Sequence, residues 1–162
     1  MSEERWSFFK DGDSSFGMFY PKNYTLAGFT DRESADSAMR DVLGNGVSQG
    51  DVQVVSGAFL IEELESQPDA SWLDRVKQSI AEFIGTETYF IDQDVALAHQ
   101  GGAFLFVYTP EDDEARRIEA IVVRNQPVYA RRYLPMAIER LVEPPPSLAS
   151  QPVDTNDGNP HR

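Results

Sequence analysis

The stretch that decides the fold is "GAFLFVYTPEDDEARRIEAIVVRNQPVYARRYL", residues 102–134. Its first eight residues form an apolar, aromatic-rich run that is typical of a buried β-strand. Pro110 and the acids at 111–114 favour the first turn of a helix. Pro127 ends that helix, and "VYARRYL" at 128–134 is again typical of a strand. The stretch therefore predicts a strand–helix–strand unit, whose helix points four apolar side chains inward: Ala115, Ile118, Ile121 and Val122.

The first half of the chain repeats this pattern. "NYTLAGFT" at 23–30 predicts a strand, Thr30-Asp31 a helix cap, and "DVQVVSG" at 51–57 a second strand. The two halves match at a constant offset of 79, with Thr30, Met39, Val42 and Leu43 corresponding to Thr109, Ile118, Ile121 and Val122. A chance match of apolar helical spacing is the alternative. Two such units in tandem predict a ferredoxin-like α+β sandwich, in which two helices cover one face of a four-stranded antiparallel sheet.

A long segment, residues 58–101, separates the two units and predicts a helical insert between the second and third strands. "FLIEEL" at 59–64 favours a short helix, "SWLDRVKQSIAEFIG" at 71–85 an amphipathic one, and "TETYFIDQDVALAHQ" at 86–100 a weaker one. The insert holds nine acids and two bases. It either covers the open face of the sheet or makes a subunit contact.

The rest of the chain divides into three parts. Residues 1–20 are an aromatic N-terminal arm that we expect to pack on the domain or on a second subunit, and 21–142 form a single α+β domain. Residues 143–162 hold five of the ten prolines and predict a flexible tail, because such a composition buries too little apolar surface to offset its ordering entropy. The alternative is that the tail is a handle for a protein partner.

Composition narrows the classes of function. The chain has 162 residues and a net charge of −13, which disfavours a nucleic-acid partner, and it has no cysteine for thiolate chemistry or disulfides. Its N-terminus lacks the pattern of a signal peptide, and no apolar run approaches the roughly 20 residues of a membrane span. We therefore expect a cytoplasmic protein with no membrane partner and no cofactor.

The strand at 103–108 is apolar on both faces, because Phe104 and Phe106 alternate with Leu105 and Val107. An RNA-recognition sheet would place a basic residue at Gln100 and an aromatic one at Gly102, so RNA stacking is disfavoured. A sheet covered on both sides, or closed by a homodimer, explains the pattern better. The candidate interface residues are Phe104, Phe106 and Tyr108.

Two patterns that resemble catalytic or metal motifs fail on context. "GVSQG" at 46–50 spells G-x-S-x-G, but a helix precedes it and a strand follows, the reverse of a nucleophile elbow, so Ser48 is predicted to be a loop residue. His99 is the one histidine outside the tail, and a metal site would have to combine it with carboxylates such as Asp92 or Asp94. The alternative is a hydrogen-bonded or solvent-facing histidine, and we predict neither a catalytic residue nor a metal site.

An arginine cluster is the most interesting polar feature of this acidic chain: Arg116, Arg117, Arg124, Arg131 and Arg132. Strand periodicity places Tyr129, Arg131 and Tyr133 on one face. Together with His99 they are candidate ligand-binding residues, because a guanidinium beside tyrosines suits an anionic or aromatic ligand. The alternative is that the arginines pair with nearby acids of the chain.

The stretch "YTLAGFTDRESADSAMRDVLGNGVSQGDVQVVSG", residues 24–57, resembles the small bacterial domains grouped with general stress protein 17M. This resemblance implies a small cytoplasmic domain without an established enzymatic activity, linked by name to stress response. It supplies no catalytic residue to carry over. The favoured hypothesis is a non-enzymatic protein that acts through association, as a homodimer. The alternative is a small-molecule binding domain or enzyme of the dimeric ferredoxin-like type.

Overall fold

The structure, a computed structural model, describes residues 22–65, 89–135, 137–145 and 148. Within these ranges the chain is α+β, as predicted, with one antiparallel sheet in the order β2-β3-β1-β4-β5. The strands are β1 (Tyr24–Phe29), β2 (Val52–Ser56), β3 (Ala103–Tyr108), β4 (Tyr129–Leu134) and β5 (Ala137–Val142). The helices are α2 (Arg32–Gly44), the short 3-10 helix η2 (Gln49–Asp51), α3 (Gly57–Glu65), α5 (Tyr89–His99) and α6 (Asp112–Arg124).

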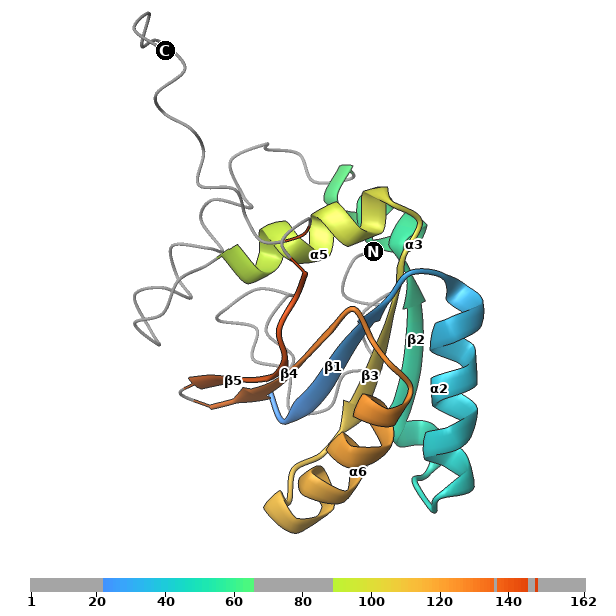
Figure 1. The fold of residues 1–162 in the computed structure, drawn as a ribbon, viewed down its shortest axis with the longest axis vertical. Coiled ribbons are helices and arrows are strands. Elements are labelled where there is room, and N and C mark those ends of the chain that lie inside the picture. Colours follow the sequence, from blue (N-terminus) through green and yellow to red (C-terminus); the bar gives the residue numbers. More distant parts are fainter. Residues whose placement is uncertain (1–21, 66–88, 136, 146–147, 149–162) are drawn as a thin grey trace, which may run out of the picture.

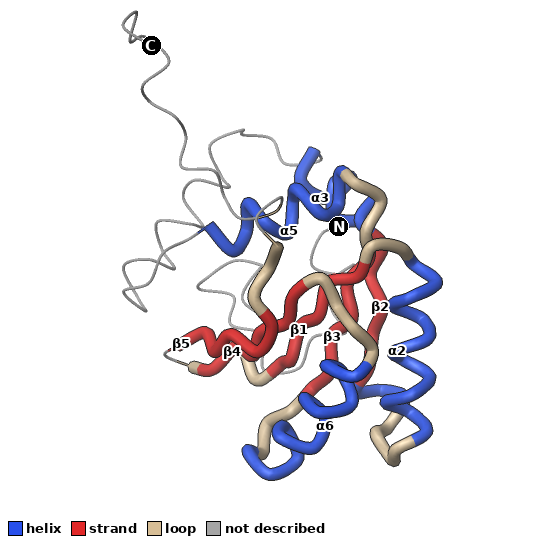
Figure 2. Tube along the Cα trace, viewed as in Figure 1, coloured by secondary structure: helices blue, strands red, loops and turns tan. Residues whose placement is uncertain are grey.

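Helices lie on both faces of the sheet (Figure 1; Figure 2). On one face α2 and α6 bury a cluster of small and branched side chains, among them Ala38, Val42, Leu105 and Ile118. On the other face α3 and α5 help to bury a more aromatic cluster, among them Leu97, Phe104, Phe106 and Tyr129. The strands are therefore buried on both sides, which explains why β1 and β3 are apolar at consecutive positions.

The helices α2 and α6 confirm the predicted internal repeat but correct its offset. Asp31 caps α2 by accepting a hydrogen bond from the Ser34 amide at 2.7 Å. The buried residues Ala35, Ala38 and Val42 of α2 correspond to Ala115, Ile118 and Val122 of α6. These pairs are 80 residues apart, one more than predicted. The apolar stripe of a helix is wide enough that a shift of one residue still matches apolar positions.

The fifth strand, β5, was not predicted, so the expected count of four strands is wrong. It pairs with β4 as a hairpin, with Ile138 opposite Tyr133 and only two residues between the strands. Glu139 and Arg140 are exposed, and most of the strand lies outside the core. Because its apolar alternation is interrupted by these charges, the usual sign of a half-buried strand is weak.

The insert is helical at both of its described ends. Helix α3 confirms the short helix predicted at 59–64, and α5 confirms the one predicted at 86–100. Both pack on the sheet face that carries Phe104, so the described part of the insert covers the sheet. The helix predicted at 71–85 and the N-terminal arm lie outside the described residues.

The segment predicted as a tail begins against the domain. Leu148 is buried in the aromatic cluster, and its amide donates a hydrogen bond to the Pro145 carbonyl at 2.9 Å. Residues 149–162 lie outside the described part of the chain, so the predicted flexible tail and its partner stay predictions.

Candidate functional site

The sheet face that α5 covers carries the predicted tyrosine–arginine group, which lies on β4. Tyr129, Arg131 and Tyr133 alternate along β4 and point to this face, whereas Ala130 belongs to the opposite core. The Arg131 side chain is only 2% exposed. Strand periodicity thus located these three side chains correctly. A buried guanidinium requires a negative partner and hydrogen-bond acceptors.

Asp94 of α5 supplies the missing charge. Its Oδ1 accepts a hydrogen bond from Arg131 Nη2 at 2.7 Å, and its Oδ2 accepts one from Arg131 Nη1 at 3.1 Å. Tyr129 Oη also donates to Asp94 Oδ1. This is a bidentate fork, the strong geometry for an arginine–carboxylate pair.

The guanidinium makes two further contacts within β4. Arg131 Nη1 donates to Tyr133 Oη at 2.8 Å, and the guanidinium carbon lies 4.5 Å from the centre of the Tyr129 ring. We call Asp94, Tyr129, Arg131 and Tyr133 the Arg131 cluster. Each member contacts Arg131, so the arginine organises the group.

Burial and charge shift the pKa values in the Arg131 cluster. Burial raises the pKa of Tyr133 to about 12, although the Arg131 charge opposes this rise. Burial, and then the charge of Asp94, raise the pKa of Tyr129 well above its ordinary value. Burial alone would lower the pKa of Arg131, but the Asp94 charge raises it on balance. At neutral pH the cluster therefore holds one cation and two neutral phenols against the Asp94 carboxylate.

Three glycines let α5 lie close enough for this contact. A Cβ on Gly28 would stand 2.6 Å from Leu97 Cδ2, and one on Gly102 would stand 2.5 Å from Leu97 Cγ. A Cβ on Gly57 would stand 2.7 Å from Ala98 Cα. Real Cβ atoms do not approach so closely, so the absence of side chains at these positions seats the last turn of α5 on the sheet.

His99 makes none of the contacts that are described for the Arg131 cluster. It is the exposed last residue of α5, five positions beyond Asp94. Among the described residues no group of three or more histidine, aspartate or glutamate side chains is placed to hold a metal ion. The structure thus brings together three of the four predicted ligand-binding residues and leaves His99 outside.

The predicted interface residues lie inside the chain. Phe104 and Phe106 are buried and Tyr108 is partly buried, in the cluster that α3 and α5 cover. Tyr24 packs between two of them, with ring centres 6.5 Å from Phe106 and 5.3 Å from Tyr108. A homodimer stays a prediction, but this face of β3 is already packed within one chain.

The alternative that the arginines pair within the chain is confirmed for three of them. Arg131 pairs with Asp94, Arg132 with Asp112 at 3.0 Å, and Arg124 with Asp41. Sequence reasoning missed Asp94 as the partner of Arg131. A signal was present, because Asp94 precedes Leu97 by three positions and Ala98 by four, which places it on the buried side of α5. A carboxylate on a buried helix face is costly unless it is paired and hydrogen-bonded, so a cationic partner is to be expected.

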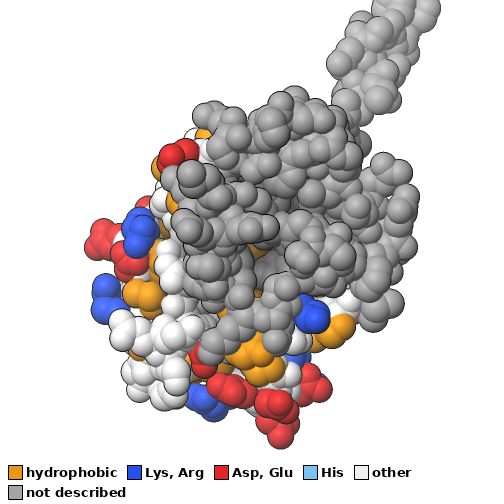
Figure 3. Space-filling model, turned by 180° about the vertical axis from the view of Figure 1, so that it is seen from behind, with side chains coloured by type: hydrophobic (Ala, Val, Ile, Leu, Met, Phe, Trp, Pro, Cys, Tyr) orange, Lys and Arg blue, Asp and Glu red, His pale blue; other side chains and the backbone are white. Residues whose placement is uncertain are grey.

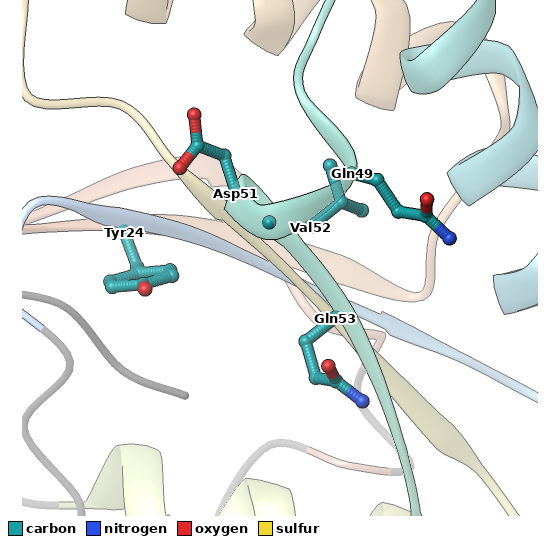
Figure 4. A pocket seen from close by; sticks show the side chains of 6 residues that line it. Tyr24, Gln49, Asp51, Val52 and Gln53 are labelled. Carbon is teal, nitrogen blue, oxygen red and sulfur yellow. The ribbon is translucent and has the colours of Figure 1, made fainter. Parts of the chain in front are cut away.

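The described surface includes a groove and a smaller pocket. A groove of about 470 Å³ runs between the end of α5, the loop before β4 and the segment from Val142 to Leu148. A smaller pocket of about 160 Å³ lies beside the start of β2, where Tyr24 and Gln53 point to the same side of the sheet (Figure 4). The Arg131 cluster lines neither of them.

Charges of both signs are interspersed on the described part of the face that Figure 3 shows, rather than gathered in one patch. Among the described helices, none has the length and apolar character that a membrane crossing requires. Comparisons with protein-family models, with curated proteins and with solved structures gave no match for this chain.

Proposed function

We propose that this protein is a non-enzymatic α+β protein that acts through association, by pairing strand β2 with the same strand of a second copy. The observation that carries the proposal is the composition of β2, "VQVVS", which contains no charge and no proline. Among the described strands β2 is outermost and pairs only with β3. Outer strands of monomeric proteins commonly carry charges, prolines or bulges that prevent such pairing.

The geometry of β2 suits a two-fold contact. In an antiparallel pair related by a two-fold axis, residues of the same parity lie opposite each other, so each side chain stays on its own face of the sheet. Centred on Val54, this pairing places Val54 opposite its own copy and Gln53 opposite Val55. It brings no like charges together and would join the two sheets into one.

The class of protein that we propose follows from the chain order. Strand–helix–strand units β1-α2-β2 and β3-α6-β4 occur in tandem. This is the arrangement of a ferredoxin-like sandwich, to which β5 and the insert helices would be additions. A cytoplasmic location and a role in stress response or regulation are parts of the proposal that rest on the resemblance of residues 24–57 to the stress-protein domains.

The test is the oligomeric state of the full chain by sedimentation velocity and native mass spectrometry. Gln53 is exposed on β2, so Gln53→Lys places a charge on the pairing edge without entering the core. Gln49→Lys is the matched control, because it adds the same charge in η2, before the strand begins. We expect a dimer for the wild type and for Gln49→Lys, and for Gln53→Lys a folded monomer with an unchanged far-UV circular dichroism spectrum, whose melting temperature falls only by the part that dimerisation supplied. A monomeric wild type, or a Gln53→Lys dimer as tight as the wild type, refutes the proposal.

A further inference from the structure

The contacts of Asp94 describe a receptor for a carboxylate. Two nitrogens of Arg131 meet the two Asp94 oxygens side by side, at 2.7 and 3.1 Å, and the Tyr129 hydroxyl donates to one of these oxygens. We propose that Tyr129, Arg131 and Tyr133 form a carboxylate-binding site on β4, which the chain's own Asp94 occupies and which takes the carboxylate of a small molecule when Asp94 is withdrawn.

The chemistry favours a planar carboxylate. The guanidinium fork matches the spacing of two carboxylate oxygens, and it offers parallel N–H groups that a single point charge would not use. One guanidinium and one neutral hydroxyl donate to the Asp94 carboxylate, so the site offers this group both a cation and a hydroxyl donor. Arg131 Nη1 also donates a hydrogen bond to Tyr133 Oη, and this bond fixes the plane of the guanidinium. The site is therefore built before any ligand arrives.

The occupant belongs to a separate element. The three receptor side chains lie on β4, in the body of the sheet, whereas Asp94 comes from α5, which covers that sheet. Asp94 is 17% exposed, against 2% for Arg131, so the carboxylate end of the pair is the end that solvent reaches. The site is separated from β2 by β1 and β3, so it does not depend on the proposed association.

The experiment empties the site and offers the smallest carboxylate. Asp94→Ala removes the carboxylate and leaves a space of about the size of formate. The full-length variant is melted in sodium formate and in sodium chloride of the same ionic strength, and formate binding is measured by titration calorimetry. We expect formate to raise the melting temperature of Asp94→Ala by a few degrees above chloride once its concentration exceeds the Kd about tenfold.

Three matched variants define specificity. Asp94→Asn keeps the volume filled and should not respond to formate beyond chloride. Asp36→Ala removes an exposed ion pair with Arg32 and should not respond either. The double variant Asp94→Ala with Arg131→Met loses the fork and should lose the formate response. A formate response that survives without Arg131 overturns the proposal.

Identical melting of Asp94→Ala in formate and chloride, with no heat of binding, also overturns it. If Asp94→Ala does not fold in chloride, refolding in the two salts followed by gel filtration decides the question. Recovery of folded protein in formate alone supports the site, and failure to recover it in either salt overturns the proposal.

Discussion

Gly28 controls how closely α5 approaches the sheet. It lies in β1 between the Leu97 side chain above it and the Tyr129 ring beside it, which would stand 2.6 and 2.9 Å from an added Cβ. Both neighbours are held in place, Leu97 by the helix and Tyr129 by its hydrogen bond to Asp94. A methyl group at this position must therefore move the helix or the Arg131 cluster.

We expect Gly28→Ala to lower the free energy of unfolding by about 1–3 kcal/mol, the usual cost of overpacking a filled core. Gly44→Ala is the matched control, because nothing lies within 4 Å of the Cβ that it would add at the end of α2. Its stability should be unchanged or slightly raised, since alanine favours helix more than glycine does. Urea unfolding of both variants measures the difference. Equal stabilities would show that α5 does not depend on this close contact.

At the same scale, the sequence predicted three of the four side chains of the Arg131 cluster. The two-residue period of a strand placed Tyr129, Arg131 and Tyr133 together, because alternation needs no knowledge of the rest of the fold. Asp94 could not be paired with Arg131 by period alone, since 37 positions separate them and only the packing of α5 joins them. His99 was grouped with the tyrosines by residue type, and the helix end carries it away from them.

Among the elements, α2 and α6 are joined at their C-terminal ends by the Asp41 carboxylate. Arg124 donates to it through Nε at 2.9 Å, and the Asn125 side chain donates at 2.9 Å. The Asn45 side chain donates to Asp41 Oδ1 at 3.2 Å. These bonds, with Arg124 as the largest cause, lower the pKa of Asp41 to about 2.

This lowered pKa predicts a pH dependence of the link between α2 and α6. In the unfolded chain an aspartate has a pKa of about 3.9. The Asp41 carboxylate therefore stabilises the fold above about pH 4, and this stabilisation is lost as the pH falls toward about 2. We expect the stability difference between the wild type and Asp41→Asn to shrink over that window, measured by urea unfolding at several pH values.

The control for this prediction is Arg124→Met, in which NMR titration should find the pKa of Asp41 higher than in the wild type, since the guanidinium is the main cause of its lowering. A stability difference between wild type and Asp41→Asn that stays constant down to about pH 2 would contradict the assignment.

The elements themselves were predicted unevenly. Helix α6 was predicted with all four of its buried residues, because its amphipathic stripe and its acidic first turn both indicate a helix at the same place. Strand β5 was missed because Glu139 and Arg140 face outward from an edge where little is buried. Pro135 and Met136, the two residues between β4 and β5, are also not among the pairs that mark a two-residue hairpin, such as Asn-Gly.

For the whole molecule, Leu148 ties the end of the described chain to the aromatic core. It is 4% exposed and belongs to the buried aromatic cluster that also holds Leu97 of α5. We expect Leu148→Ala to lower the free energy of unfolding by about 2–5 kcal/mol, the range for truncating a buried leucine to alanine. Val123→Ala is the control, because Val123 is 43% exposed on α6 and should change stability by only about 0.5 kcal/mol or less.

Thermal and urea unfolding of the two variants give the comparison. A Leu148→Ala protein as stable as Val123→Ala would show that the chain beyond β5 does not contribute to the core. The sequence predicted this region as a tail from its prolines. Composition averages over a segment, and one leucine among prolines is too small a signal to show that the segment packs.

The strand order has a consequence for how the chain is made. Strands β1 and β2 do not pair with each other. Strand β1 pairs with β3 and β4, and strand β2 pairs with β3. A nascent chain that has emerged only as far as Ser56 therefore carries two apolar strands without any native sheet neighbour. About 50 more residues must be synthesised before β3 emerges, which takes roughly 3–10 seconds at about 5–20 residues per second. During that interval the native sheet cannot yet protect β1 and β2. Protection of these strands from pairing with other chains must then come from the ribosome or from chaperones bound to the nascent chain.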